Sequence, residues 1–186
     1  MNEKAVTALF GSADKMKIVR IFVFNPDKSF AVDAAALHVG LTKARVQKEI
    51  KNLLKISLVS RKARGFVLNK TFPYLASLRE FLSATNPDGA EILQKMKGVG
   101  KIQLLALAGI FIRNPESRLD ILVVGDKMKK LALDKVLRSL ESRIGKELAF
   151  SVFDTDDFKY RVSMRDKLVL DVLDFPHEKI VNKLGI

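Results

Sequence analysis

A glycine turn between two apolar periodic segments constrains the fold of this chain more than any other feature. Gly40 lies between a short segment that begins near Asp33 and a longer one that begins at Thr42. Threonine is a favoured helix N-cap, and glycine suits the C-terminal turn of a helix. After Thr42, apolar residues follow the spacing i, i+4, i+7 and i+8, which is typical of one buried helix face. These residues are Val46, Ile50, Leu53 and Leu54. The sequence therefore predicts two helices joined by a tight turn, the second running to about Lys55.

Signals on both sides extend this helix pair into a small domain. A helix capped by Asp14 is predicted to run to about Phe24, and Asp33 is expected to cap the short helix before Gly40. The other predicted elements are an extended segment at 29–31, strands at 58–62 and 66–69 about a turn at 63–65, and a helix at 72–82.

This order of helix, short strand, helix, turn, helix and hairpin resembles the winged helix-turn-helix domains of bacterial and archaeal transcriptional regulators. The resemblance covers about Asp14 to Leu82, and it depends on the runs 34–42 and 53–65. It implies that the helix after Gly40 is a recognition helix, whose N-terminal residues reach base edges in the major groove of duplex DNA.

The distribution of charge agrees with a nucleic-acid partner for this part of the chain. Residues 1–84 contain 15 Lys and Arg against 6 Asp and Glu, a balance of +9. Residues 85–186 contain 18 against 15, a balance of +3. A basic half beside a nearly neutral half indicates a module that binds a polyanion, joined to a domain of a different kind.

If the apolar stripe of the second helix faces the core, its opposite face carries the candidate DNA contacts. Glutamine pairs with adenine and arginine with guanine at base edges, whereas lysine more often contacts phosphates. A basic hairpin tip lies against a phosphate backbone or enters a minor groove. The predicted DNA-binding residues are Thr42, Lys43, Arg45, Gln47, Lys48, Lys51, Arg61, Lys62 and Arg64. The alternative is a solvated helix face with a hairpin that packs on a partner protein.

Turn-forming residues at 83–89 mark the boundary between two predicted domains, 1–84 and 90–186. The second is expected to be a small α/β domain with a mixed sheet, which makes the whole chain α+β. Its predicted elements are a short helix at 90–96, strands at 101–108 and 119–124 joined by a loop at 109–118, a helix at 129–144, a strand at 147–153, one C-terminal helix from 154 or 155 to about 173, and a short strand at 180–182.

The stretch 107–124 resembles the core motif of small nucleotidyltransferases of the polymerase-beta type. In that family a Gly-Ser loop holds the nucleotide phosphates, and an Asp-x-Asp pair with a third carboxylate binds divalent metal. Gly109 matches the glycine and Asp120 matches the second aspartate. Ile110 stands where the serine belongs, and Arg118 stands where the first aspartate belongs.

The incomplete match implies a nucleotidyltransferase-like fold that has no catalytic residues, no metal site and no cofactor. The strand that should carry the third carboxylate has none, and Asp154 lies just beyond its end. Arg118 would repel Mg²⁺ and is expected to pair with Asp120 instead. A remnant site for a nucleotide or another anionic ligand is expected to consist of Gly109, Arg113, Arg118 and Asp120, with Lys127 nearby. Dimerisation is an equal alternative for this domain.

These observations together predict a regulator of transcription that binds double-stranded DNA as a homodimer. The chain has no cysteine, no recognisable signal peptide and no apolar stretch of the ~20 residues that a membrane span needs, so we expect a cytoplasmic location and no membrane partner. One alternative is an active nucleotidyltransferase that uses the winged helix to dock its target. Another is a protein-interaction adaptor without nucleic-acid affinity.

Overall fold

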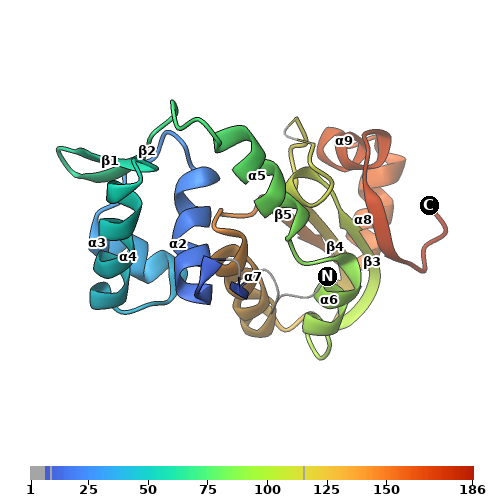
Figure 1. The fold of residues 1–186 in the computed structure, drawn as a ribbon. Helices are drawn as coiled ribbons and strands as arrows, with labels where there is room; N and C mark the ends of the chain where they lie inside the picture. The colour runs from blue at the N-terminus through green and yellow to red at the C-terminus, as the bar shows by residue number, and fades with distance from the viewer. Residues whose placement is uncertain (1–6, 9, 115) are drawn as a thin grey trace. The chain divides into compact units, whose positions relative to one another are not determined.

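The computed structural model describes residues 7–8, 10–114 and 116–186 and shows an α+β protein (Figure 1). The chain divides into two compact units. The first comprises Met1–Asn86 and Leu140–Glu147, and the second comprises Pro87–Ser139 and Leu148–Ile186. The predicted α+β class and the mixed sheet are confirmed. Residues 1–6 of the predicted first domain, residue 9, and Pro115 of the predicted 109–118 loop lie outside the described residues.

The first unit combines helices with a two-stranded hairpin. Its elements are α2 (Ala13–Val23), α3 (Val32–Val39), α4 (Lys43–Lys55), β1 (Val59–Lys62), β2 (Gly65–Leu68) and α5 (Leu75–Ala84). The core lies where α2, α3 and α4 meet, and its fully buried side chains include Ile18, Ile21, Phe22, Ile50 and Leu53.

The turn between α3 and α4 has the predicted conformation. Gly40 follows α3 with a left-handed backbone, φ 66°, which glycine adopts without the steric cost that a Cβ brings. Thr42 caps α4 because its Oγ1 accepts a hydrogen bond from the backbone N–H of Arg45 at 3.5 Å. The predicted apolar stripe of α4 faces the core: Val46, Ile50 and Leu53 are at most 1% exposed, and Leu54 is half-buried.

The predicted caps of the two preceding helices are wrong. Ser12 caps α2, and its Oγ accepts from the backbone N–H of Lys15 at 3.1 Å. The residue before α3 is Ala31, which makes no side-chain cap. Asp14 and Asp33 instead lie within the first turns of their helices, where the helix dipole favours a negative charge. Their carboxylates are therefore free to contact other side chains.

The hairpin is tied to the helices by the segment that precedes α3. β1 and β2 pair antiparallel, with Lys62 opposite Gly65. Phe30 forms a bridge with Phe66, in which each backbone N–H donates to the other carbonyl, at 2.8 and 2.9 Å. Gly65 has φ 143°, and a Cβ there would overlap the backbone of Phe30. Glycine at this position therefore lets the two backbones approach.

The end of α7 (Lys130–Ile144) belongs to the first unit. Two polar side chains hold it there, one within α2 and one just after α2. Arg20 is 1% exposed, and its guanidinium donates to the carbonyls of Leu82 at 2.9 Å and Ile144 at 3.4 Å. Asn25 donates to the carbonyl of Gly145 at 2.7 Å. A cation near C-terminal helix carbonyls is favoured by the helix dipole. No pattern in the sequence indicated this attachment.

The second unit is built on a four-stranded sheet. Its elements are α6 (Gly89–Lys95), β3 (Lys101–Leu107), the 3₁₀ turn η1 (Gly109–Phe111), β4 (Ile121–Asp126), the first part of α7, β5 (Phe150–Phe153), α8 (Thr155–Ser163), α9 (Lys167–Asp174) and β6 (Glu178–Asn182). The strand order is β5-β4-β3-β6. β3 pairs antiparallel with both β4 and β6, whereas β4 and β5, joined through α7, are parallel. None of the helices in the described ranges has the length and apolarity that a membrane crossing requires.

One continuous C-terminal helix was predicted, and this is wrong. The structure has two separate helices, α8 and α9. Arg165 has φ 54°, a left-handed conformation that ends the first helix. Asp166 then starts the second, because its Oδ1 accepts from the backbone N–H groups of Leu168 at 2.9 Å and Val169 at 3.3 Å. Side chains of both helices pack on one face of the sheet, and this cluster includes Leu104, Leu122, Phe158, Val169 and Val172.

Candidate nucleic-acid interface

The outer face of α4 carries positive charge and amide groups without any acidic residue. Its exposed side chains are Lys43, Ala44, Arg45, Gln47, Lys48, Lys51 and Lys55. Glu49 is the acidic residue of this helix; it is half-buried and accepts a hydrogen bond from Asn52 at 3.2 Å. All the helix residues predicted to contact DNA therefore lie at exposed positions, as does Thr42 at the cap.

The hairpin adds a second group of cations directly after α4. Ser57, with φ 58°, turns the chain out of the helix and into β1. Arg61, Lys62 and Arg64 are exposed at the end of β1 and in the turn to β2. The hairpin tip projects away from α2 (Figure 1). No acidic residue occurs between Ile50 and Leu68, so the charge of this segment is uniformly positive.

Two of the predicted contact residues are engaged by carboxylates from the neighbouring helices. Lys43 Nζ lies 2.8 Å from Asp33 Oδ2, and both side chains are 69% exposed. Arg45 donates to Asp14 Oδ2 at 3.1 Å. Neither carboxylate was predicted as a member of this site, because both aspartates were expected to be helix caps. The acidic residues in the first turns of α2 and α3 were the available signal.

The remaining basic residues of the predicted interface make no ion pair with any residue that the structure describes. They are Lys48, Lys51, Arg61, Lys62 and Arg64. An exposed ammonium or guanidinium outside an ion pair is available to neutralise a phosphate, which releases condensed counterions from DNA. Among the described residues, the interface therefore contains five cations outside ion pairs. It also contains Lys43 and Arg45, which a phosphate can bind only by displacing the carboxylate that each contacts.

In the second unit, the predicted remnant motif is closed around Asp120. This residue is 3% exposed. Its Oδ1 accepts from the backbone N–H of Ile110 at 2.8 Å, and its Oδ2 accepts from that of Ala149 at 2.9 Å. The carboxylate thus joins the turn after β3 to the segment before β5. Both oxygens of this carboxylate therefore accept hydrogen bonds from backbone amides, which stabilise its negative charge.

Gly109 is required by the same carboxylate. It has φ 51°, and a Cβ at this position would overlap Asp120 Oδ1. In the resemblance, the glycine lets the backbone approach a nucleotide phosphate; here the backbone N–H of Ile110 already binds the Asp120 carboxylate. Gly109 and Asp120 therefore contact each other. The Asp120 carboxylate occupies the place beside this turn that a nucleotide phosphate would take in the resemblance.

The two arginines of the predicted remnant site lie at exposed positions. The predicted pairing of Arg118 with Asp120 is wrong: Arg118 Nε lies 2.9 Å from Asp171 Oδ2, on α9. Asp120 is buried and its oxygens are taken by amides, whereas Asp171 lies within reach of the Arg118 side chain. Arg113 has φ 62°, a left-handed conformation, two residues after η1.

Asp154, just beyond the strand that should carry the third carboxylate, is exposed and caps α8 by accepting from the backbone N–H of Asp157 at 2.8 Å. Lys127 is exposed, with φ 53°, just after β4. Within residues 7–8, 10–114 and 116–186, no group of His, Asp or Glu side chains is arranged to hold a metal ion. Comparison of the chain with models of protein families, with curated proteins and with solved structures finds no match.

Proposed function

We propose that the first unit is a winged helix-turn-helix that binds double-stranded DNA, and that the chain is a cytoplasmic regulator of transcription. The observation that carries this proposal is the exposed surface of α4 and the hairpin. Every exposed residue of α4 is Lys, Arg, Gln or Ala, and the hairpin adds three exposed cations with no acidic residue. A solvated helix face usually mixes charges of both signs, so an exposed helix face that carries only basic and neutral residues favours a polyanion partner.

In this proposal α4 enters the major groove and the hairpin acts as the wing. The major groove admits an α-helix, and side chains near the start of the helix reach the base edges. Arg45 and Gln47 occupy that end of α4 and have the donor and acceptor groups that read guanine and adenine. Lys48 and Lys51 contact phosphates, and so do the three basic residues of the hairpin.

Readers of this type commonly bind two half-sites about one DNA turn apart as a dimer. We therefore propose that the chain acts as a homodimer, which sedimentation of the protein with and without duplex DNA would test. A monomer that binds DNA with one copy per site would contradict this part of the proposal.

For the second unit we propose a nucleotidyltransferase-like arrangement without transferase activity. The order β3, turn, β4, α7, β5 supports it, because an antiparallel pair is followed by a helical crossover to a parallel strand. The hydrogen bonds of Asp120 argue against catalysis, since its carboxylate is buried and occupied by two amides. Incubation with Mg²⁺, DNA or RNA and labelled nucleoside triphosphates is expected to transfer no label. Transfer that disappears in the Asp120→Asn variant would instead favour the active enzyme.

Gel-shift measurements with a random DNA duplex test the binding proposal. The double variant Lys48→Glu/Lys51→Glu is expected to lose most of the affinity, because two phosphate contacts become repulsive. The matched control is Lys135→Glu/Lys159→Glu, which makes the same change in net charge at exposed positions of the second unit. Equal losses in the two double variants would show that net charge, not this surface, determines binding. No binding by the unmodified protein at low salt would favour the protein-interaction adaptor.

A further inference from the structure

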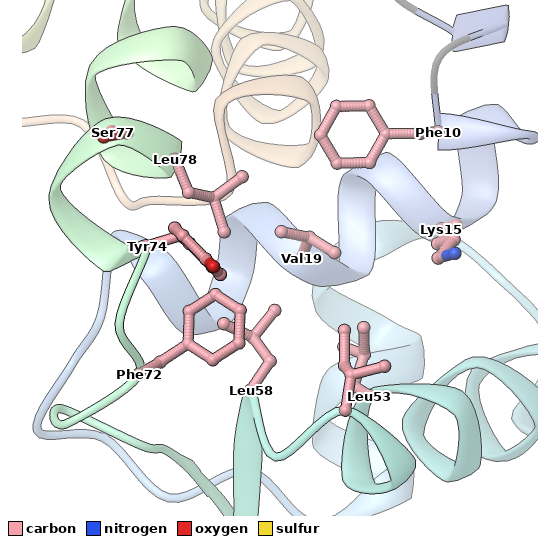
Figure 2. A pocket seen from close by; sticks show the side chains of 10 residues that line it. Phe10, Lys15, Val19, Leu53, Leu58, Phe72, Tyr74, Ser77 and Leu78 are labelled. Carbon is pink, nitrogen blue, oxygen red and sulfur yellow. The ribbon is translucent and has the colours of Figure 1, made fainter.

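An apolar pocket of about 420 Å³ lies in the first unit, on the inner side of α4 (Figure 2). Its walls come from α2 and the residue Phe10 before it, from the end of α4 and the turn that leads into β1, and from α5 with the segment before it. The apolar walls include Val19, Leu53, Leu58, Phe72, Tyr74 and Leu78. A volume in the range of about 300–1,000 Å³ with mainly apolar and aromatic walls is typical of small-molecule sites.

The polar groups on the pocket wall are few, and only one of them is charged. Lys15, on α2, supplies an ammonium, while Tyr74 and Ser77 supply hydroxyls. Lys15 is half-buried and forms no ion pair with the described part of the chain. In Figure 2, Lys15 and Tyr74 lie on opposite sides of the apolar centre formed by Val19 and Leu58. The pocket thus has an apolar body and a cation at its edge.

We propose that this pocket binds a small monocarboxylate with an apolar body, such as a medium-chain fatty acid. The apolar part would replace water along the walls near Val19, Leu58 and Phe72, which is favourable in proportion to the apolar area buried. The carboxylate would pair with the ammonium of Lys15, which forms no ion pair within the described ranges 7–8, 10–114 and 116–186. A cationic ligand would be repelled by Lys15, and a neutral ligand would leave its charge unpaired.

The site is separate from the surface proposed to contact DNA. Leu53 and Ile56 line the pocket from the buried side and the C-terminal end of α4, whereas the candidate DNA contacts lie on the exposed face and the N-terminal end. Ligand binding is therefore measurable without DNA, and it stands whether or not the chain binds DNA.

Titration of the full-length protein with octanoate, followed by the methyl NMR signals of leucine and valine, tests the proposal. We expect saturable shifts at Val19, Leu53, Leu58 and Leu78 with a stoichiometry of one, and no comparable shifts at Leu133 of the second unit. No saturable shift up to the concentration at which octanoate aggregates would overturn the proposal. Shifts centred on other methyl groups would overturn it as well.

The role of the cation is tested with Lys15→Gln and with the matched control Lys17→Gln, a half-buried lysine on the same helix that does not line the pocket. Lys15→Gln should weaken octanoate binding by about three- to fivefold, the effect of one partly exposed ion pair, and leave the binding of 1-octanol unchanged. Lys17→Gln should change neither. Equal octanoate affinities of the two variants, at equal thermal stability, would contradict the assigned role of Lys15.

Discussion

Replacement of Asp14 by asparagine is expected to strengthen the binding of duplex DNA and to make it more sensitive to salt. In the free protein the Asp14 carboxylate pairs with Arg45 at 3.1 Å, at the N-terminal end of α4. On a random duplex, which offers Arg45 no specified guanine, a DNA phosphate that approaches this side chain must displace the Asp14 carboxylate or be repelled by it. The Asp14→Asn variant removes both the competition and the repulsion.

The magnitude follows from the number of cations that are available for phosphates. Five basic residues of the interface are without an ion-pair partner among the described residues, while Lys43 and Arg45 are paired. If each available cation neutralises one phosphate, the logarithm of the affinity falls against the logarithm of the salt concentration with a slope of about −4.5. Release of Arg45 would add one contact and change the slope to about −5.4. An exposed ion pair is worth up to about 1 kcal/mol, so the affinity at low salt should rise by up to about fivefold.

Fluorescence anisotropy of a labelled random duplex, measured over a series of salt concentrations, gives both quantities. The matched control is Glu147→Gln, which makes the same charge change by breaking the exposed ion pair with Lys28 in the same unit. The control should raise affinity less and leave the slope near that of the unmodified protein. Identical slopes and affinities in Asp14→Asn and Glu147→Gln would refute the reasoning, because Asp14 would then act through net charge alone.

Three further predictions concern the supports of the two units. Arg20→Met should destabilise the first unit by about 3 kcal/mol in urea unfolding, because buried carbonyls lose a charged donor; a loss within experimental error would contradict the role given to Arg20. Gly109→Ala should be strongly destabilising in the unmodified protein, because the new Cβ overlaps the Asp120 side chain. In an Asp120→Ala background this overlap is removed, and the same substitution should lower the free energy of unfolding by only about 1–2 kcal/mol, the cost of a left-handed backbone at a residue with a Cβ. Equal losses in both backgrounds would exclude the overlap as the cause. Lys70 donates a hydrogen bond to Asp27 and, with its charge, holds the pKa of Asp27 below its ordinary value, so the stability from this carboxylate is present above its unfolded-state pKa and lost as pH falls through the folded-state pKa. Lys70→Gln should therefore raise the Asp27 pKa in a carboxyl-carbon NMR titration, and an unchanged value would disprove this cause.

Local signals in the sequence predicted the part of the fold that positions the candidate interface. The periodicity of α4, the cap at Thr42 and the left-handed glycine at Gly40 depend on neighbours within one or two helical turns, and all are present in the structure. The caps at Asp14 and Asp33 were wrong because a first-turn carboxylate and a cap have nearly the same sequence position. The difference matters, since a first-turn carboxylate is available to pair with a side chain of α4.

Contacts between distant residues were beyond the reach of sequence patterns. The motif around Gly109 and Asp120 was recognisable in the sequence. The hydrogen bond that Asp120 accepts from the Ala149 N–H was not, because it depends on the parallel alignment of β4 and β5. Arg118 pairs with Asp171 because α9 folds beside it, and nothing near Arg118 in the sequence indicates that partner. Arg20 likewise reaches Ile144 across 124 positions of sequence.

The most direct test of the central claim is a titration of the isotope-labelled protein with duplex DNA, followed by its backbone amide NMR signals. If α4 enters the major groove and the hairpin contacts the backbone, the largest saturable shifts should fall at residues 42–51 and 61–65, and they should decrease with added salt. Residues of β3 and β4 should change little. Shifts confined to the second unit, or no saturable shift at low salt, would contradict the claim that this surface binds DNA.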